Sequence, residues 1–209
     1  PFRSQLPEEV FTKAYVSPPG DARFISGITR ELFGADHAVV TGARVGAVQA
    51  PGGSGALRLG AGLLLRAKGD TQLWVPAPTW GNHIPLMGAA GLDMQQYPYY
   101  DKQTHVIEFE AMVDTLKQRG PGDVVLLHGC CHNPCGADLT REQWDTIGDL
   151  AEERGFTPYV DFAYHGLAEG MDADAYGVRM LADRLPELLV AYSASKNFGL
   201  YRERTGLAL

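Results

Sequence analysis

The segment Asp123-Val124-Val125-Leu126-Leu127-His128 holds four consecutive apolar residues between two polar ones. Such a short apolar run, half of it β-branched, is typical of a strand buried on both faces in a parallel sheet covered by helices. A strand with one face in water would instead alternate apolar and polar residues. The segment therefore predicts an interior strand of an α/β domain.

Apolar runs and helical patterns alternate on both sides of this strand. Strands are predicted at 43–50, 72–76, 93–97, 123–128, 157–162, 188–193 and 205–209. Helices are predicted at 24–33, 54–67, 79–90, 109–118, 140–154 and 174–184. Thr140 and Gln143 have the spacing of a capping box. This β-α-β-α order predicts right-handed crossovers in a mostly parallel seven-stranded sheet with helices on both faces.

One large domain with an irregular N-terminal segment is expected. Residues 1–23 contain four prolines and are predicted to be irregular, whereas 24–209 form the domain. The 209 residues, 45% of them hydrophobic, suffice for a sizeable core. Because the chain lacks an initiator methionine and ends on an apolar run, it is expected to be a fragment.

Composition argues against several classes of partner. The chain carries 18 basic and 25 acidic residues without a block of like charge, so nucleic acid and anionic membranes are poor partners. The apolar run at 59–65 is too short to span a membrane. Three cysteines within 130–135 argue against a disulfide framework and for the reducing cytoplasm. With His128 and His132 they raise a zinc alternative, but vicinal cysteines converge poorly, so free thiols and no metal are predicted.

Lys196 follows an apolar run and lies in a segment of small and polar residues, close to Arg202 and Arg204. Partial desolvation and nearby cations favour a neutral amine, which a Schiff-base lysine needs. A surface lysine that merely follows a strand is the alternative.

Gly52-Gly53-Ser54-Gly55 opens a predicted helix after the first strand. Free amides and a hydroxyl at a helix N-terminus bind phosphate, although a plain turn into a helix also explains this pattern. Arg204 offers a bidentate partner for phosphate oxygens, or is a surface arginine.

Polar and aromatic residues also follow other strands, at the edge where open α/β sheets bind ligands. Asp161 ends a buried strand, where its carboxylate would meet either a protonated pyridine nitrogen or a helix N-terminus. Tyr164 and Asn133 could hydrogen-bond an oxygen on the same ring. Alternatively, Tyr164 packs at the rim of the sheet and Asn133 belongs to a turn. Trp80 either stacks on a flat cofactor ring or is an ordinary core aromatic. His128 supports a catalytic carboxylate or is a core histidine. Together these groups match pyridoxal 5′-phosphate.

Three motifs closely resemble the aspartate and aromatic amino-acid aminotransferases, fold-type I enzymes that use pyridoxal phosphate. They are His128-Gly129-Cys130-Cys131-His132-Asn133-Pro134, Asp161-Phe162-Ala163-Tyr164 and Ser195-Lys196-Asn197-Phe198-Gly199-Leu200-Tyr201. Gly52-Gly53-Ser54-Gly55-Ala56-Leu57-Arg58 and Thr79-Trp80-Gly81-Asn82-His83 match in the same order. The resemblance covers roughly 15–209.

This resemblance implies a role for each site residue. Lys196 binds the cofactor aldehyde and moves the substrate proton, and Asp161 keeps the ring nitrogen protonated. The other assignments are Gly53, Ser54, Ser193 and Arg204 for the phosphate, Asn133 and Tyr164 for the ring oxygen, Trp80 for stacking, and His128 for support of Asp161. Tyr15 resembles a tyrosine that reaches the partner's phosphate, which implies a homodimer with shared sites.

The implied reaction moves an amino group from aspartate or an aromatic amino acid to 2-oxoglutarate. A fold-type I lyase or β-decarboxylase and a non-catalytic cofactor-binding fragment are the alternatives. Cys135 and Ser54 stand where the family usually has threonine. The resemblance places both substrate-binding arginines and the C-terminal small domain beyond residue 209. The chain is therefore expected to bind the cofactor but to transaminate poorly.

Overall fold

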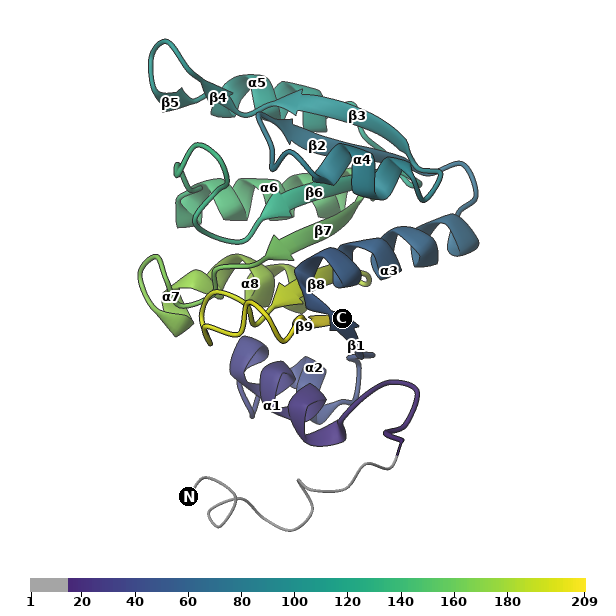
Figure 1. Cartoon of the computed structure of the whole chain (residues 1–209). Helices are drawn as coiled ribbons and strands as arrows, with labels where there is room; N and C mark the ends of the chain where they lie inside the picture. Colours follow the sequence, from purple (N-terminus) through teal and green to yellow (C-terminus); the bar gives the residue numbers. More distant parts are fainter. Residues whose placement is uncertain (1–14) are drawn as a thin grey trace.

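A seven-stranded sheet forms the centre of the computed structural model, which describes residues 15–209. Its order is β1-β9-β8-β7-β6-β2-β3 (Figure 1). The strands are β1 Val48–Pro51, β2 Gln72–Ala77, β3 Asp93–Pro98, β6 Val124–His128, β7 Thr157–Phe162, β8 Leu189–Ser193 and β9 Thr205–Ala208. Strand β9 pairs antiparallel with both β8 and β1, and every other pairing in this sheet is parallel. The predicted mostly parallel α/β sheet is confirmed.

Helices cover both faces of the sheet (Figure 1). The helices on one face are α1 Ala22–Phe33, α5 Phe109–Leu116, α6 Arg141–Arg154 and α8 Tyr176–Arg184, and those on the other are α3 Gly52–Ala67 and α4 His83–Gly88. In β6, Val125 and Leu127 pack into the first core, whereas Val124 and Leu126 pack into the second. Burial on both faces explains why this strand carries no polar residue in its interior.

Several predicted helix boundaries were wrong, and the end predicted at 118 lies at Leu116. The helix predicted at 79–90 is shorter, because it begins only after a turn in which the His83 amide donates to the Trp80 carbonyl, and it ends at Gly88. The helix predicted at 174–184 is preceded by a separate short helix, α7 Met171–Asp174. Helix α3 begins at Gly52, two residues before the predicted start.

The first strand is also shorter than predicted. Residues 43–47 are not part of it, and a short helix, α2 Ala38–Thr41, comes just before them. Ala43 has a φ of 52°, a left-handed conformation that interrupts an extended chain. A two-stranded hairpin, β4 Tyr100–Asp101 with β5 Val106–Ile107, was not predicted, because two residues are too few to show a period.

The irregular segment predicted at 1–23 is only partly described, since 1–14 lie outside the described residues. Helix α1 begins inside that segment, at Ala22. The Asp21 carboxylate caps it by accepting from the amides of Arg23 and Phe24. No helix within 15–209 is both long enough and apolar enough to cross a membrane.

Candidate active site

The carboxyl ends of β1, β2, β6, β7 and β8 meet around one cavity of about 360 Å³. Ten of the eleven residues predicted for the site line it: Gly53, Ser54, Trp80, His128, Asn133, Asp161, Tyr164, Ser193, Lys196 and Arg204. The eleventh, Tyr15, is fully exposed and is not among the lining residues. The sheet therefore gathers groups that lie up to about 150 residues apart in the sequence, as expected for this edge of an α/β fold.

A candidate anion site lies where β1 passes into α3. Gly52 has a φ of 74°, and a Cβ there would come within 2.7 Å of the Arg204 guanidinium. A Cβ at Gly53 would lie 3.0 Å from the Ser193 Cβ. Both glycines thus let the start of α3 approach a cation and a hydroxyl closely. The helix dipole and free amides at this N-terminus favour a bound anion.

Asp161 is nearly buried at the end of β7, with only 9% of its side chain exposed. Its Oδ2 lies 2.9 Å from Nε2 of His83, a fully buried residue at the start of α4. A carboxylate at such a site needs a hydrogen-bond donor, and His83 supplies it. Sequence reasoning missed this role, although His83 stood within the quoted motif 79–83.

The predicted support of Asp161 by His128 is indirect in this geometry. His128 reaches the carboxylate only through two other side chains: its Nε2 lies 3.2 Å from the Thr79 hydroxyl, which lies 2.7 Å from Nδ1 of His83. Burial and the neighbouring His132 and His83 rings hold the pKa of His128 well below its usual value. The reason is positional: β6 and β7 place His128 beside Asp161 in register, but α4 places His83 on the carboxylate itself.

Lys196 lies in the turn that follows β8. Its Nζ is 4.9 Å from the centre of the Tyr164 ring, within the range of a cation–π contact. Partial burial raises the pKa of the Tyr164 hydroxyl, and a hydrogen bond to Asn133 opposes this rise. An amine, a phenol and an amide thus meet on one side of the cavity, with Asp161 also in its wall.

The cysteine cluster has one member, Cys130, in the cavity wall, and it forms no disulfide. Cys130, Cys131 and Cys135 are all free thiols, as predicted. Sγ of Cys135 lies 3.1 Å from Nδ1 of His132, whose ring stacks between those of Tyr99 and His128. Within residues 15–209, no three His, Cys, Asp or Glu side chains are grouped as a metal site would require.

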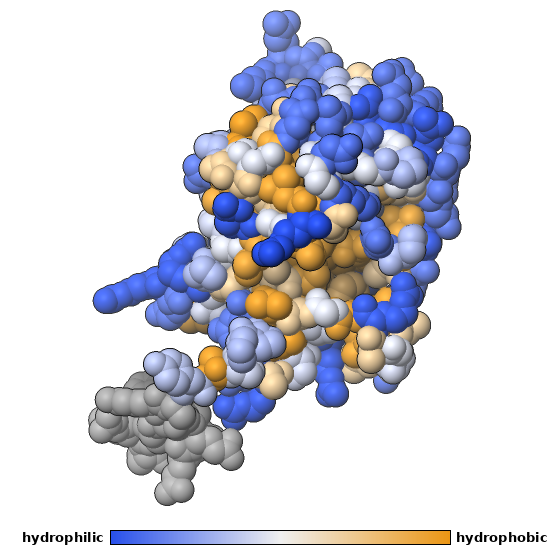
Figure 2. Space-filling model, turned by 90° about the vertical axis from the view of Figure 1, so that its right-hand side faces the viewer, coloured by the Kyte–Doolittle hydropathy of each residue, from blue (hydrophilic) through white to orange (hydrophobic). Residues whose placement is uncertain are grey.

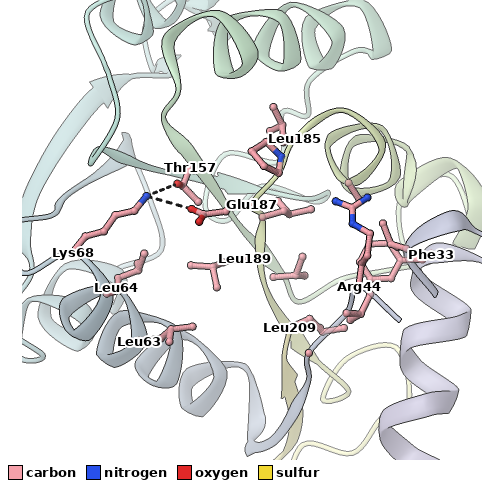
Figure 3. Close-up of a pocket in the computed structure, with 18 residues that line it drawn as sticks. Phe33, Arg44, Leu63, Leu64, Lys68, Thr157, Leu185, Glu187, Leu189 and Leu209 are labelled. Carbon is pink, nitrogen blue, oxygen red and sulfur yellow. Dashed lines mark hydrogen bonds and ion pairs between the residues drawn. The ribbon is translucent and has the colours of Figure 1, made fainter. Parts of the chain in front are cut away.

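An apolar groove of about 320 Å³ lies at the opposite edge of the sheet. Leu64 of α3, Leu189 of β8 and Leu209 line it (Figure 3). Figure 2 shows apolar side chains gathered around a hollow on that side of the molecule. Two cations, Arg44 and Lys68, line its wall, and Lys68 is paired with Glu187 at 3.3 Å. The groove lies at the amino ends of β7 and β8, so the strand-end groups described above are not part of it.

A comparison with known protein families identifies the family of this chain. The family model described as "Aminotransferase class I and II" matches residues 10–209. The chain belongs to this aminotransferase family. The aspartate aminotransferase of Escherichia coli (strain K12) is 44% identical over 201 residues, which are 96% of this chain and 51% of that protein. The aromatic-amino-acid aminotransferase of Paracoccus denitrificans is 43% identical over 198 residues, covering 95% and 50%.

Solved aminotransferases have the same fold. The aromatic-amino-acid aminotransferase from Burkholderia pseudomallei, covalently bound to pyridoxal phosphate, superimposes with a TM-score of 0.93 at 36% identity. This alignment covers 99% of the present chain and 51% of that one. The chain thus spans about half the length of the aminotransferases it matches.

Proposed function

We propose that this chain is the cofactor-binding part of a pyridoxal-phosphate-dependent aminotransferase of the aspartate or aromatic type. One observation carries the proposal: the Lys196 amine, the Asp161 carboxylate and the anion site at the start of α3 share one cavity. These groups complement the aldehyde, the pyridine nitrogen and the phosphate of the cofactor. Its relatives named as aspartate and aromatic aminotransferases support the same assignment.

The residues present fit this cofactor. The cavity volume lies within the range of small-molecule sites. A Cβ at 52 would displace the Arg204 guanidinium and one at 53 would crowd Ser193, so the two glycines favour the close approach that a phosphate cradle requires. We assign Gly53, Ser54, Ser193 and Arg204 to the phosphate, Asn133 and Tyr164 to the ring oxygen, Trp80 to the ring face, Asp161 to the ring nitrogen and Lys196 to the aldehyde.

When bound, pyridoxal phosphate supplies an electrophilic aldehyde and a ring that accepts electrons from the substrate α-carbon. Asp161 favours the protonated ring nitrogen, because a nearby negative charge stabilises a cation. His83 holds that carboxylate in place from behind. Lys196, at the end of a four-carbon side chain, would be the base that takes the proton from the substrate α-carbon and donates it to the cofactor C4′.

The substrates proposed are aspartate or an aromatic amino acid with 2-oxoglutarate as acceptor. We also propose a homodimer, because Tyr201 in the cavity wall and Phe198 in the turn that carries Lys196 expose large apolar side chains, and Tyr15 is fully exposed. A cytoplasmic location suits the three free thiols.

Borohydride reduction in the presence of pyridoxal phosphate tests the central assignment. The purified chain should develop visible absorption with the cofactor, and reduction should attach the cofactor to the peptide that contains Lys196. Lys196→Ala should abolish this attachment. The control Lys117→Ala should leave it intact, since Lys117 is an exposed residue that pairs with Asp114. Attachment to other lysines alone would contradict the proposal.

Product analysis with aspartate separates the alternatives. Residues 1–209 by themselves should convert aspartate slowly, because orientation of the substrate carboxylate supplies much of the rate and the matched aminotransferases are about twice as long. Oxaloacetate is the expected product. Alanine would indicate β-decarboxylation instead.

A further inference from the structure

A buried chain of hydrogen bonds lies behind the cavity, next to two of its residues. Tyr192, on β8, is fully buried. Its hydroxyl lies 2.7 Å from Nδ2 of Asn197 and 3.2 Å from Nδ1 of His165. Nε2 of His165, also fully buried, lies 2.8 Å from the carbonyl oxygen of Met171. The function proposed above assigns no role to these residues.

The direction of every hydrogen bond in this series, from donor to acceptor, is fixed. The Met171 carbonyl can only accept, so Nε2 of His165 carries a proton and donates. In a neutral ring Nδ1 is then an acceptor, and burial lowers the pKa of His165 and keeps the ring neutral. The Tyr192 hydroxyl, with a single proton, donates to Nδ1. Its oxygen therefore accepts from the Asn197 amide, which sets the orientation of that amide.

Two members of this hydrogen-bond chain, His165 and Asn197, adjoin in sequence a residue that lines the cavity. His165 directly follows Tyr164, and Asn197 directly follows Lys196. The rings of His165 and Phe162 stack at 4.7 Å, so the histidine is held by β7. Tyr192 thus links the loop after β7 to the turn after β8.

The turn that carries Lys196 has few other anchors of this kind. The Gly199 amide donates to the Lys196 carbonyl at 3.1 Å, which closes the turn. Phe198 and Gly199 are exposed, and the Ser195 amide bonds the hydroxyl of Ser193 at the base. Asn197 extends from this turn into the core, where its side-chain amide bonds the buried Tyr192 hydroxyl.

We propose that His165, Tyr192 and Asn197 are positioning residues that hold Lys196 and Tyr164 in fixed relative places; this rests on the role proposed above for Lys196. A catalytic amine must be held in a narrow range of positions, and a buried, fully directed hydrogen-bond chain is suited to do so.

Hydrogen exchange of the cofactor-free chain tests the anchoring. Tyr192→Phe deletes one hydroxyl without changing the ring, and should speed exchange of amides 194–199 about five- to tenfold. The matched control is Tyr97→Phe, which removes a hydroxyl that donates to the Leu126 carbonyl at 2.7 Å from β3. It should leave exchange in 194–199 unchanged. Unaltered exchange there in Tyr192→Phe would overturn the proposal.

A spectroscopic titration tests the effect on the lysine itself. With pyridoxal phosphate bound, the midpoint of the pH-dependent visible absorption should shift by about half a pH unit or more in Tyr192→Phe and in Asn197→Ala. Tyr97→Phe should keep the parental midpoint. The double variant should shift no further than either single one, because both break the same link.

The exchange experiment and the spectroscopic titration distinguish failure of the positioning role from failure of the proposed function. Parental midpoints in both variants would overturn the positioning role even if exchange increased. If the unmodified chain develops no cofactor absorption, the proposed function fails, whereas the exchange comparison still decides whether these residues anchor the turn.

Discussion

Two glycines of α3 show how a single residue position sets the packing beside the site. A Cβ at Gly60 would lie 2.2 Å from the hydroxyl of Tyr159, a buried side chain on β7 that bonds carbonyls of α3. A Cβ at Gly62 would meet nothing within 4 Å. The same helix therefore contains one glycine required by packing and one that is not.

Alanine should have opposite effects at these two positions. Gly60→Ala should destabilise the fold by about 1–3 kcal/mol, because it forces α3 away from Tyr159. Gly62→Ala should stabilise it by about 0.5–1 kcal/mol, the usual gain in helix propensity. Urea unfolding of the two variants measures both values. Equal effects would show that α3 does not pack on β7 as described.

At the scale of an element, α6 has the most completely specified ends. Thr140 accepts from the Gln143 amide, and the Gln143 side chain accepts from the Thr140 amide, so the predicted capping box is confirmed. Gly155, with a φ of 78°, ends the helix in a left-handed conformation. These local signals allowed its boundaries to be predicted closely.

Removal of the cap should cost measurable stability. Thr140→Ala leaves the Gln143 amide without its partner and should lower the free energy of unfolding by about 1 kcal/mol. Thr146→Ala is the control, since that hydroxyl bonds the Glu142 carbonyl inside the same helix. It should change stability by less than about 0.5 kcal/mol. A comparable loss in both variants would contradict a specific capping effect.

For the whole molecule, buried histidines couple stability to pH. Burial lowers the pKa of His132 to about 4, and that of His128 also lies well below its usual value. Between about pH 6.5 and pH 4 these histidines bind protons in the unfolded chain but not in the folded one. The free energy of unfolding is therefore unaffected by these histidines above about pH 6.5, and it decreases as the pH falls toward 4.

Acid should accordingly unfold this protein in a histidine-dependent way. The free energy of unfolding should fall on the order of 2 kcal/mol between pH 7 and pH 4.5, and His132→Phe should reduce this slope. His105→Gln is the control, because His105 lies exposed between β4 and β5 and should retain the slope. Denaturant titrations at several pH values measure it. Equal slopes for His132→Phe and the parent chain would contradict this explanation.

Local pattern was sufficient to predict the sheet and most of the residues that line the cavity. The apolar run in β6 predicted a strand buried on both faces, and the polar residues after each strand predicted the edge where the cavity lies. Both predictions depend on neighbours in sequence, because burial sets the period of a strand and parallel strands end at one edge.

Only the tertiary structure decided which side chains meet. His83 rather than His128 bonds Asp161 across 78 residues of sequence, and Tyr192 joins two loops that carry no shared motif. The tertiary structure alone also revealed the antiparallel direction of β9 and the separation of α7 from α8. The physical reason is that periodicity records whether a residue is buried, whereas a partner distant in sequence is chosen by how helices and strands pack in three dimensions.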